Sequence, residues 1–151
     1  MEITSEVVKQ LRDRTGVSVM ECKKALVESD GDMDKALAIL GAKSSASVAK
    51  KADRELAEGA VAAYVHNTTQ VGAMVLLASE TDFVSKNEEF VNLGKDIAMH
   101  AAAMKPADIA ELMEQPFIKD PSKTIRDMIA AATQKFGERI EITKFAFFSV
   151  K

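Results

Sequence analysis

The residues best suited to chemistry in this 151-residue chain are one cysteine, Cys22, and two histidines, His66 and His100. A thiolate is a nucleophile, and an imidazole is a general base or a metal ligand. Neither histidine has a second ligand at the i, i+4 spacing of a helical metal site, and the chain has no glycine-rich phosphate loop. Cys22 falls on the predicted inner face of a helix, where cysteine is usually a small buried hydrophobe. We therefore expect a binding protein rather than an enzyme, with no cofactor and no metal.

Composition and charge narrow the class of protein further. With 47% hydrophobic and 28% charged residues, the chain has the composition of a folded protein rather than a disordered one. Its formal net charge of -3 and its lack of tryptophan disfavour a general nucleic-acid binder or a membrane-surface protein. A single cysteine precludes an internal disulfide, and the N-terminus shows neither an apolar signal core nor an arginine-rich transit segment. We expect a cytoplasmic location, with no membrane span and no direct nucleic-acid contact.

The first forty residues carry the start and stop signals of three short helices. The predicted N-caps and helix ends are, in chain order, Thr4, Gly16, Ser18, Asp32 and Gly41. Helices this short are unstable singly, so they must pack on one another. We expect residues 1–42 to form a helical head, followed over residues 43–58 by a linker rich in Lys, Ser and Ala.

From residue 59 onward the pattern becomes mixed. Weak alternation over residues 60–66, a turn at 67–70 and an apolar run over 71–78 predict a hairpin whose second strand is buried on both faces. A capping box formed by Ser85 and Glu88 predicts the start of a long helix that stops before Lys105 and Pro106.

The rest of the chain predicts two more helices and one more strand. A short helix is expected over residues 109–113 and another from Ile125 to Gly137, with a proline-punctuated loop between them. A final strand is expected over residues 140–150, with one face formed by Ile140, Ile142, Ala146, Phe148 and Val150. The fold class is therefore α+β, in which residues 59–151 form a dimerisation-type core with an antiparallel sheet of about three strands packed with helices.

Two segments are not explained by structure alone. In the first, Val19 and Met20 occupy the first positions of a predicted helix, beside the cations Arg12 and Lys23. An apolar pair ringed by positive charge suits a partner helix that carries acids. The alternative is that Val19 or Met20 packs into the small core of the head.

The second segment is the turn from Glu80 to Ser85, which contains Phe83 and Val84 where polar residues are expected. Val84 lacks an apolar residue at the position required for a hydrophobic staple, because that residue is Glu89. Phe83 either folds back onto the body or projects as an anchor for another protein. Periodicity alone favours the core position.

Several motifs resemble those of the elongation factor Ts family. In the head these are Leu11-Arg12-x-Arg14-Thr15-Gly16, Cys22-Lys23-Lys24-Ala25-Leu26 and Gly31-Asp32-Met33-Asp34-Lys35-Ala36. In the body they are Thr81-Asp82-Phe83-Val84, which matches the most recognisable body motif of that family, and the segments 115–120 and 136–140. The resemblance covers essentially the whole chain, and the motifs are specific in combination.

The resemblance implies a guanine-nucleotide exchange factor for the GTPase elongation factor Tu, with a three-helix ubiquitin-associated-like head. By family analogy the head docks on the partner through Arg12, Val19, Met20 and Lys23. The body binds the partner through the motif from Thr81 to Val84, all four residues of which are expected contacts. Within this motif the pair Asp82 and Phe83 inserts beside the nucleotide site and displaces elements that hold magnesium and phosphate.

The chain also departs from the family pattern. Many members have a longer body with a duplicated core half, whereas this chain has one half and a shortened stretch between Pro106 and Gln115. It resembles in this respect the shorter members that work as homodimers. Where the family often has two basic residues near the last strand, this chain has Thr143 and Lys144.

Two other functions compete with this interpretation. A protein-binding adaptor could use the head alone, but it would leave Asp82 and Phe83 without a purpose. A thiol-dependent protein would use Cys22, and modification of that thiol would then abolish its function.

Overall fold

The computed structural model describes residues 2–151, which divide into two units. Of these residues, the first unit contains 2–53 and Asp127–Gly137, and the second contains Arg54–Arg126 and Glu138–Lys151. Within residues 2–151, no helix combines the length and the apolar character that a membrane crossing requires. The α+β class predicted from the sequence is confirmed. The predicted division into a head, a linker and a core at residues 42 and 58 stays a prediction.

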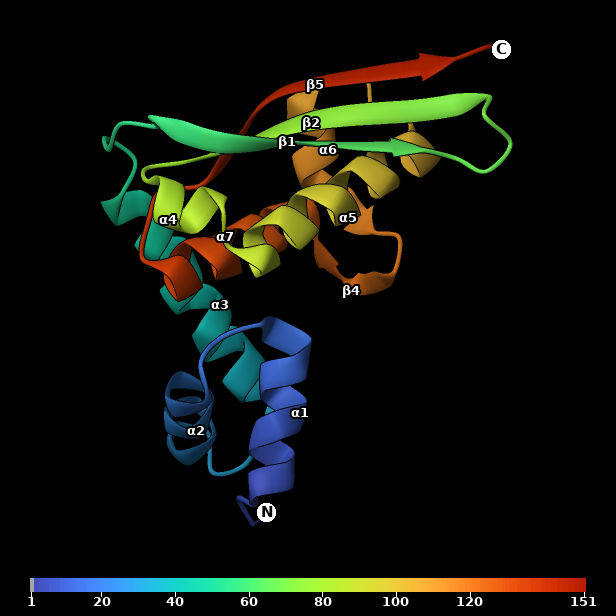
Figure 1. Ribbon diagram of the computed structural model, residues 1–151. Coiled ribbons are helices and arrows are strands. Elements are labelled where there is room, and N and C mark those ends of the chain that lie inside the picture. The colour runs from blue at the N-terminus through green and yellow to red at the C-terminus, as the bar shows by residue number, and fades with distance from the viewer. Residues whose placement is uncertain (1) are drawn as a thin grey trace. The chain divides into compact units, whose positions relative to one another are not determined.

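The first unit begins with three helices, α1 (Ser5–Thr15), α2 (Val19–Glu28) and α3 (Met33–Lys50), shown from blue to teal in Figure 1. The predicted N-caps are confirmed, because the side chains of Thr4, Ser18 and Asp32 accept hydrogen bonds from backbone N–H groups three residues further on. Gly16 ends α1 in the left-handed conformation, at φ 72°. The core of this bundle contains Val8, Leu11, Val17, Cys22, Ala25, Leu26, Ala36 and Leu40.

The predicted end of the third helix at Gly41 is wrong, because α3 continues to Lys50. Glycine lowers helix stability by about 1 kcal/mol relative to alanine, which good helix formers on either side can offset. Residues Ala42, Lys43 and Ala46 are such helix formers, and Gly41 itself is exposed. Half of the segment expected to be a linker, residues 43–50, is therefore helical.

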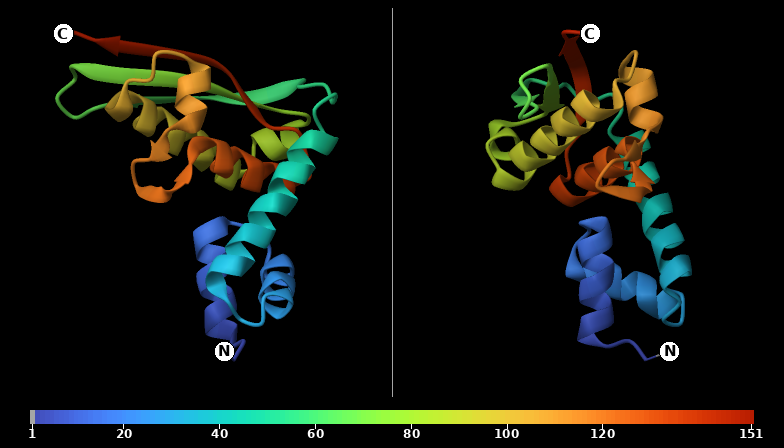
Figure 2. Two further views of the ribbon diagram at one scale, coloured as in Figure 1. Left: turned by 180° about the vertical axis from the view of Figure 1, so that it is seen from behind. Right: turned by 90° about the vertical axis from the view of Figure 1, so that its right-hand side faces the viewer.

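The second unit is built on a three-stranded antiparallel sheet with the order β1-β2-β5. The strands are β1 (Glu58–Val65), β2 (Val71–Ser79) and β5 (Glu141–Ser149), and the predicted hairpin β1–β2 is confirmed. Helix α5 (Glu88–Met104) lies along one face of the sheet (Figures 1 and 2). The buried apolar residues of the sheet and of α5 include Ala62, Ala73, Val75, Leu77, Phe90, Ile97, Ala98 and Ala101.

Two predictions about the faces of this sheet are wrong. Strand β2 is not buried on both faces, since Met74 is exposed. The last strand does not keep one face along its length, because Thr143 is an extra residue where the β2–β5 register shifts. One inserted residue turns all later side chains to the opposite face. Ile142 is consequently buried, whereas Phe148 is 72% exposed.

The chain between α5 and β5 forms α6 (Ile109–Glu114), β3 (Pro116–Phe117), β4 (Asp120–Thr124) and α7 (Ile125–Phe136). Both helices were predicted. The loop between them contains a short antiparallel pair of strands, β3–β4, which was not predicted. The strands are only two and five residues long and contain two prolines, so they have no alternating pattern that could reveal them.

Candidate functional site

Phe83 lies on a one-turn helix, α4 (Asp82–Ser85), that follows strand β2 directly. The neighbouring residues Val84 and Ser85 are buried, and they fix this turn to its own unit. Phe83 itself is 87% exposed, so the core position that periodicity favoured is wrong and the ring projects into solvent. An aromatic ring this exposed leaves a large apolar surface in water, which is the usual property of an interface anchor.

The start of the next helix also differs from the prediction. Ser85 does not begin the long helix as part of a capping box; it is the last residue of α4. Asn87 is the N-cap of α5, and its side-chain oxygen accepts a 2.8 Å hydrogen bond from the N–H of Glu89. The Ser85-to-Glu88 spacing was misleading because asparagine two residues later is an equally good cap. As a result, α4 and α5 are separate helices, and Phe83 stands on the shorter one.

Asp82 lies beside Phe83 on the same turn and is half exposed. Its Oδ2 lies 3.4 Å from Nζ of Lys86, an i, i+4 ion pair between two exposed side chains. Pairs of this kind contribute little to stability, roughly 0.3–0.5 kcal/mol. The carboxylate of Asp82 is therefore held only weakly by Lys86.

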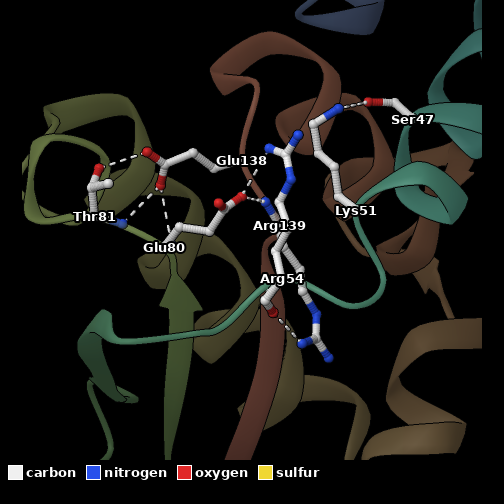
Figure 3. A network of polar contacts seen from close by, with 7 residues as sticks. All are labelled: Ser47, Lys51, Arg54, Glu80, Thr81, Glu138 and Arg139. Atoms are coloured by element: carbon white, nitrogen blue, oxygen red, sulfur yellow. Dashed lines mark hydrogen bonds and ion pairs between the residues drawn. The ribbon is translucent and has the colours of Figure 1, made fainter.

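A carboxylate distant in sequence holds the backbone just before α4 (Figure 3). Oε1 of Glu138 accepts hydrogen bonds from the N–H groups of Glu80, at 3.1 Å, and Thr81, at 3.0 Å. Its Oε2 accepts a third bond, 2.6 Å long, from the hydroxyl of Thr81. The hydroxyl of Thr81 consequently makes no cap for α4. Glu138 lies in segment 136–140, which resembles the family, but it was not predicted as a site residue because a contact across 57 residues has no local sequence signal.

The carboxylate of Glu80 in turn holds the segment that contains Glu138. Oε2 of Glu80 accepts a 2.5 Å hydrogen bond from the N–H of Arg139, and it also lies 3.4 Å from Nη1 of Arg54. The guanidinium of Arg139 donates to the carbonyl oxygen of Arg54 at 2.6 Å and to Glu141 at 2.8 Å. Segments 80–81 and 138–139 are thus joined by side chains in both directions (Figure 3).

The candidate residues of the head lie around α1 and α2. Val19 and Met20 are 51% and 66% exposed, so neither packs into the small core. A shallow groove of about 320 Å³ is lined by Ile3, Thr4, Ser5, Val8, Lys9, Arg12, Val19 and Lys23. Its lining combines apolar side chains with three cationic ones, a combination that suits an apolar helix face bordered by acids. Met20 lies outside the residues that line this groove.

The structure therefore gathers the candidate residues into two separate sets. Arg12, Val19 and Lys23 share the groove in the first unit. Thr81, Asp82, Phe83 and Val84 are contiguous on and beside α4 in the second unit.

The cysteine and the two histidines first considered for chemistry lie outside both of these sets. Cys22 is fully buried, and this burial raises the pKa of its thiol, which disfavours the reactive thiolate. His66 is exposed, and its Nδ1 lies 3.1 Å from the hydroxyl of Tyr64. Among residues 2–151, no three His, Cys, Asp or Glu side chains are placed to share a metal ion.

His100 is fully buried and serves the structure of the second unit. Its Nδ1 accepts a 3.1 Å hydrogen bond from the N–H of Ile118, so the proton of the neutral ring belongs on Nε2, which lies 2.9 Å from Oε1 of Gln115. Burial lowers the pKa of His100, and its bond to Gln115 opposes part of that shift. Both ring nitrogens are therefore occupied in holding β3 and the residues beside it to α5.

Comparison with known proteins defines the class. A family model described as "Elongation factor TS" matches residues 80–151. The protein named elongation factor Ts of Acetivibrio thermocellus is 39% identical over 191 aligned positions, which cover 97% of this chain and 89% of the relative. The relative of the same name in Thermosipho melanesiensis is 39% identical, with 98% of each chain covered. That of Thermodesulfovibrio yellowstonii is 39% identical, with 99% of this chain and 97% of the relative covered.

These matches place the chain among the translation elongation factors. More narrowly, the chain belongs to the elongation factor Ts family. Each of these alignments is longer than the 151 residues of this chain, so the relatives contain residues that have no counterpart here.

Proposed function

We propose that this protein is the guanine-nucleotide exchange factor of elongation factor Tu, which binds the GDP-loaded GTPase and promotes GDP release during translation elongation in the cytoplasm. The observation that carries the proposal is that Phe83 is 87% exposed on a one-turn helix, α4, which the buried side chain of Val84 fixes to its own unit. Membership of the elongation factor Ts family supports the same partner. The protein performs no covalent chemistry in this role and is not an enzyme.

Exchange follows from differential binding. A factor that binds the nucleotide-free GTPase more tightly than the loaded one must lower nucleotide affinity by the same ratio, because the two equilibria are linked. Phe83 leaves water only when the elements of the partner move aside, so burial of this ring favours the displaced state. Asp82 enters beside it. Magnesium bridges phosphate oxygens to protein ligands, and a small displacement of those ligands weakens the hold on the nucleotide.

The other candidate residues divide into docking and support. In the head, Arg12, Val19, Met20 and Lys23 supply an exposed apolar and cationic surface for a helix of the GTPase. In the body, Thr81 and Val84 position the turn: Thr81 is bonded to Glu138 through its N–H and its hydroxyl, and Val84 is buried. Val84 is only 7% exposed and offers little surface to a partner, so its contribution is to fix the turn that carries Phe83.

We further propose that the protein works as a homodimer formed through the sheet. Several apolar side chains of β1, β2 and β5 are exposed, on or at the end of the sheet: Val61, Val65, Met74, Phe148 and Val150. Exposed apolar clusters of this kind favour association. A second copy of the chain would cover the same side chains on both partners, as in any two-fold interface.

The test of the exchange function is release of labelled GDP from elongation factor Tu with catalytic amounts of this protein. We expect release to accelerate strongly and to saturate with rising factor concentration. An unchanged rate of GDP release would refute the proposal. The competing adaptor function predicts binding by the head without any effect on nucleotide release, so the same assay separates the two.

A further inference from the structure

We infer that Glu138 is a positioning residue for nucleotide exchange: its carboxylate fixes the backbone from which Asp82 and Phe83 project. The inference rests on the proposed exchange function. It assigns a role to a residue that lies outside the motif from Thr81 to Val84 and touches neither Asp82 nor Phe83 through any recorded hydrogen bond.

The carboxylate of Glu138 is placed to hold the segment that leads into α4. All three donors to Glu138 belong to Glu80 and Thr81, the two residues between strand β2 and helix α4. Past the end of the strand, these two N–H groups are no longer in the β2 ladder and need another acceptor. One oxygen holds both N–H groups and the other holds the hydroxyl of Thr81. Three bonds in two directions restrict rotation of this segment as well as its displacement.

The orientation of Phe83 depends on its backbone. Because the ring is 87% exposed, packing against its own unit does little to orient it. Helix α4 is a single turn, too short to be stable alone. The direction of the ring is therefore set by what holds the ends of the turn. Val84 and Ser85 are buried at one end, and Glu138 holds the other.

Glu138 and Glu80 together form a brace, because the carboxylate of each accepts hydrogen bonds from the segment of the other. The carboxylate of Glu80 accepts a hydrogen bond from the N–H of Arg139, the residue after Glu138, and also pairs with Arg54. Arg139 is fastened in turn to the carbonyl of Arg54 and to Glu141. Glu138 is consequently itself held at its backbone (Figure 3). A wedge that displaces the elements of a partner needs such a support, because a flexible segment loses binding energy in becoming ordered.

The test compares Glu138→Ala, Glu138→Gln and Thr81→Val with the wild-type protein. The matched control is Glu114→Ala, which removes an exposed carboxylate of the same unit that is paired with Arg126. For each protein, release of labelled GDP from elongation factor Tu is measured over a range of factor concentrations. This separates the maximal rate from the concentration that gives half of it. Thermal unfolding and hydrogen exchange at the amides of Glu80 and Thr81 are measured on the same samples.

We expect Glu138→Ala to lower the maximal rate by about tenfold or more, with a half-saturating concentration within about twofold of wild type. The amides of Glu80 and Thr81 should exchange faster in this variant. Glu138→Gln keeps one oxygen able to accept both N–H bonds, so it should restore most of the rate. Thr81→Val loses only the hydroxyl bond and should lower the rate by about two- to fivefold. Glu114→Ala should behave as wild type.

The outcomes distinguish this inference from the proposed function. If the wild-type protein does not accelerate GDP release, the exchange function fails. If it does, and folded Glu138→Ala retains the full maximal rate, exchange stands and the positioning role of Glu138 is refuted. Should Glu138→Ala not fold, Thr81→Val and Glu138→Gln decide. A wild-type rate for Thr81→Val, or a rate for folded Glu138→Gln tenfold below wild type, overturns the inference.

Discussion

Phe83 and Val84 are adjacent apolar residues with opposite environments. Val84 faces its own unit and Phe83 faces solvent, although nothing in the local sequence distinguishes them. Successive residues of a helical turn point about 100° apart, so burial of Val84 on a one-turn helix leaves Phe83 outside. The exposure of Phe83 is therefore a consequence of the burial of Val84.

Replacing Phe83 with alanine should slow GDP release from elongation factor Tu by about tenfold or more while leaving the protein folded. The free energy of unfolding should change by less than about 0.5 kcal/mol, because the ring makes little contact with its own chain. The measurements are exchange kinetics and urea unfolding. Ile118→Ala, which shortens another exposed apolar side chain of the same unit, is the control. Normal stimulated release by Phe83→Ala would contradict the wedge mechanism.

His100 should make stability depend on pH. Its pKa in the folded protein is lowered, chiefly by burial, so the folded state disfavours the charged ring. The unfolded chain takes up the proton near pH 6.5, so stability is complete above that pH and is lost as the pH falls toward the lowered pKa. Urea unfolding from pH 7.5 to pH 5 should show this loss, and His100→Gln should flatten that part of the profile. An equal slope in the variant would assign the loss to other groups.

At the scale of elements, the head shows which sequence signals fix the start and the end of a helix. The side-chain caps at Thr4, Ser18 and Asp32 set the helix starts because each bond spans three residues. Gly41 did not end α3, since glycine in the absence of a competing cap only weakens a helix. The groove between α1 and the start of α2 depends on both helices, and only its individual residues were predicted.

Reversing the charge of Lys23 should weaken docking of the head without altering the wedge. Lys23→Glu should raise the half-saturating factor concentration by about three- to tenfold at low salt, with the maximal exchange rate unchanged. The effect should diminish as salt screens the interaction. Lys35→Glu alters net charge equally on α3, away from the residues that line the groove, and serves as the control. Identical kinetics for the two variants would exclude the groove as a docking site.

At the scale of the whole molecule, the bulge at Thr143 has the widest consequence. It turns Phe148 away from the face that Ile142 occupies, with which it was predicted to share a face, to the exposed side of the sheet. Without this extra residue, Ala146 and Phe148 would lie on the same face of the strand as the buried Ile142. The exposed apolar side chains proposed as a dimer interface are therefore partly a product of one irregularity in register.

Introducing a charge among these side chains should dissociate the proposed dimer. We expect sedimentation to show a dimer for the wild-type protein and a monomer for Met74→Lys, because two ammonium groups would be buried against apolar surface. Val27→Lys, on an exposed position of α2, should leave the assembly unchanged. A monomeric wild-type protein at micromolar concentration would refute the dimer.

The sequence by itself determined where the helices of the head begin, the β1–β2 hairpin, the α+β class and the family, because caps, periodicity and contiguous motifs act over a few residues. The tertiary structure decided the outward direction of Phe83, the environment of Phe148 and the brace formed by Glu138. These depend on which residues meet across long separations, 57 residues in the case of Glu138 and Thr81, and on a register shift between strands. Local patterns carry no information about such meetings, because the energy that selects them comes from the assembled sheet and its neighbours.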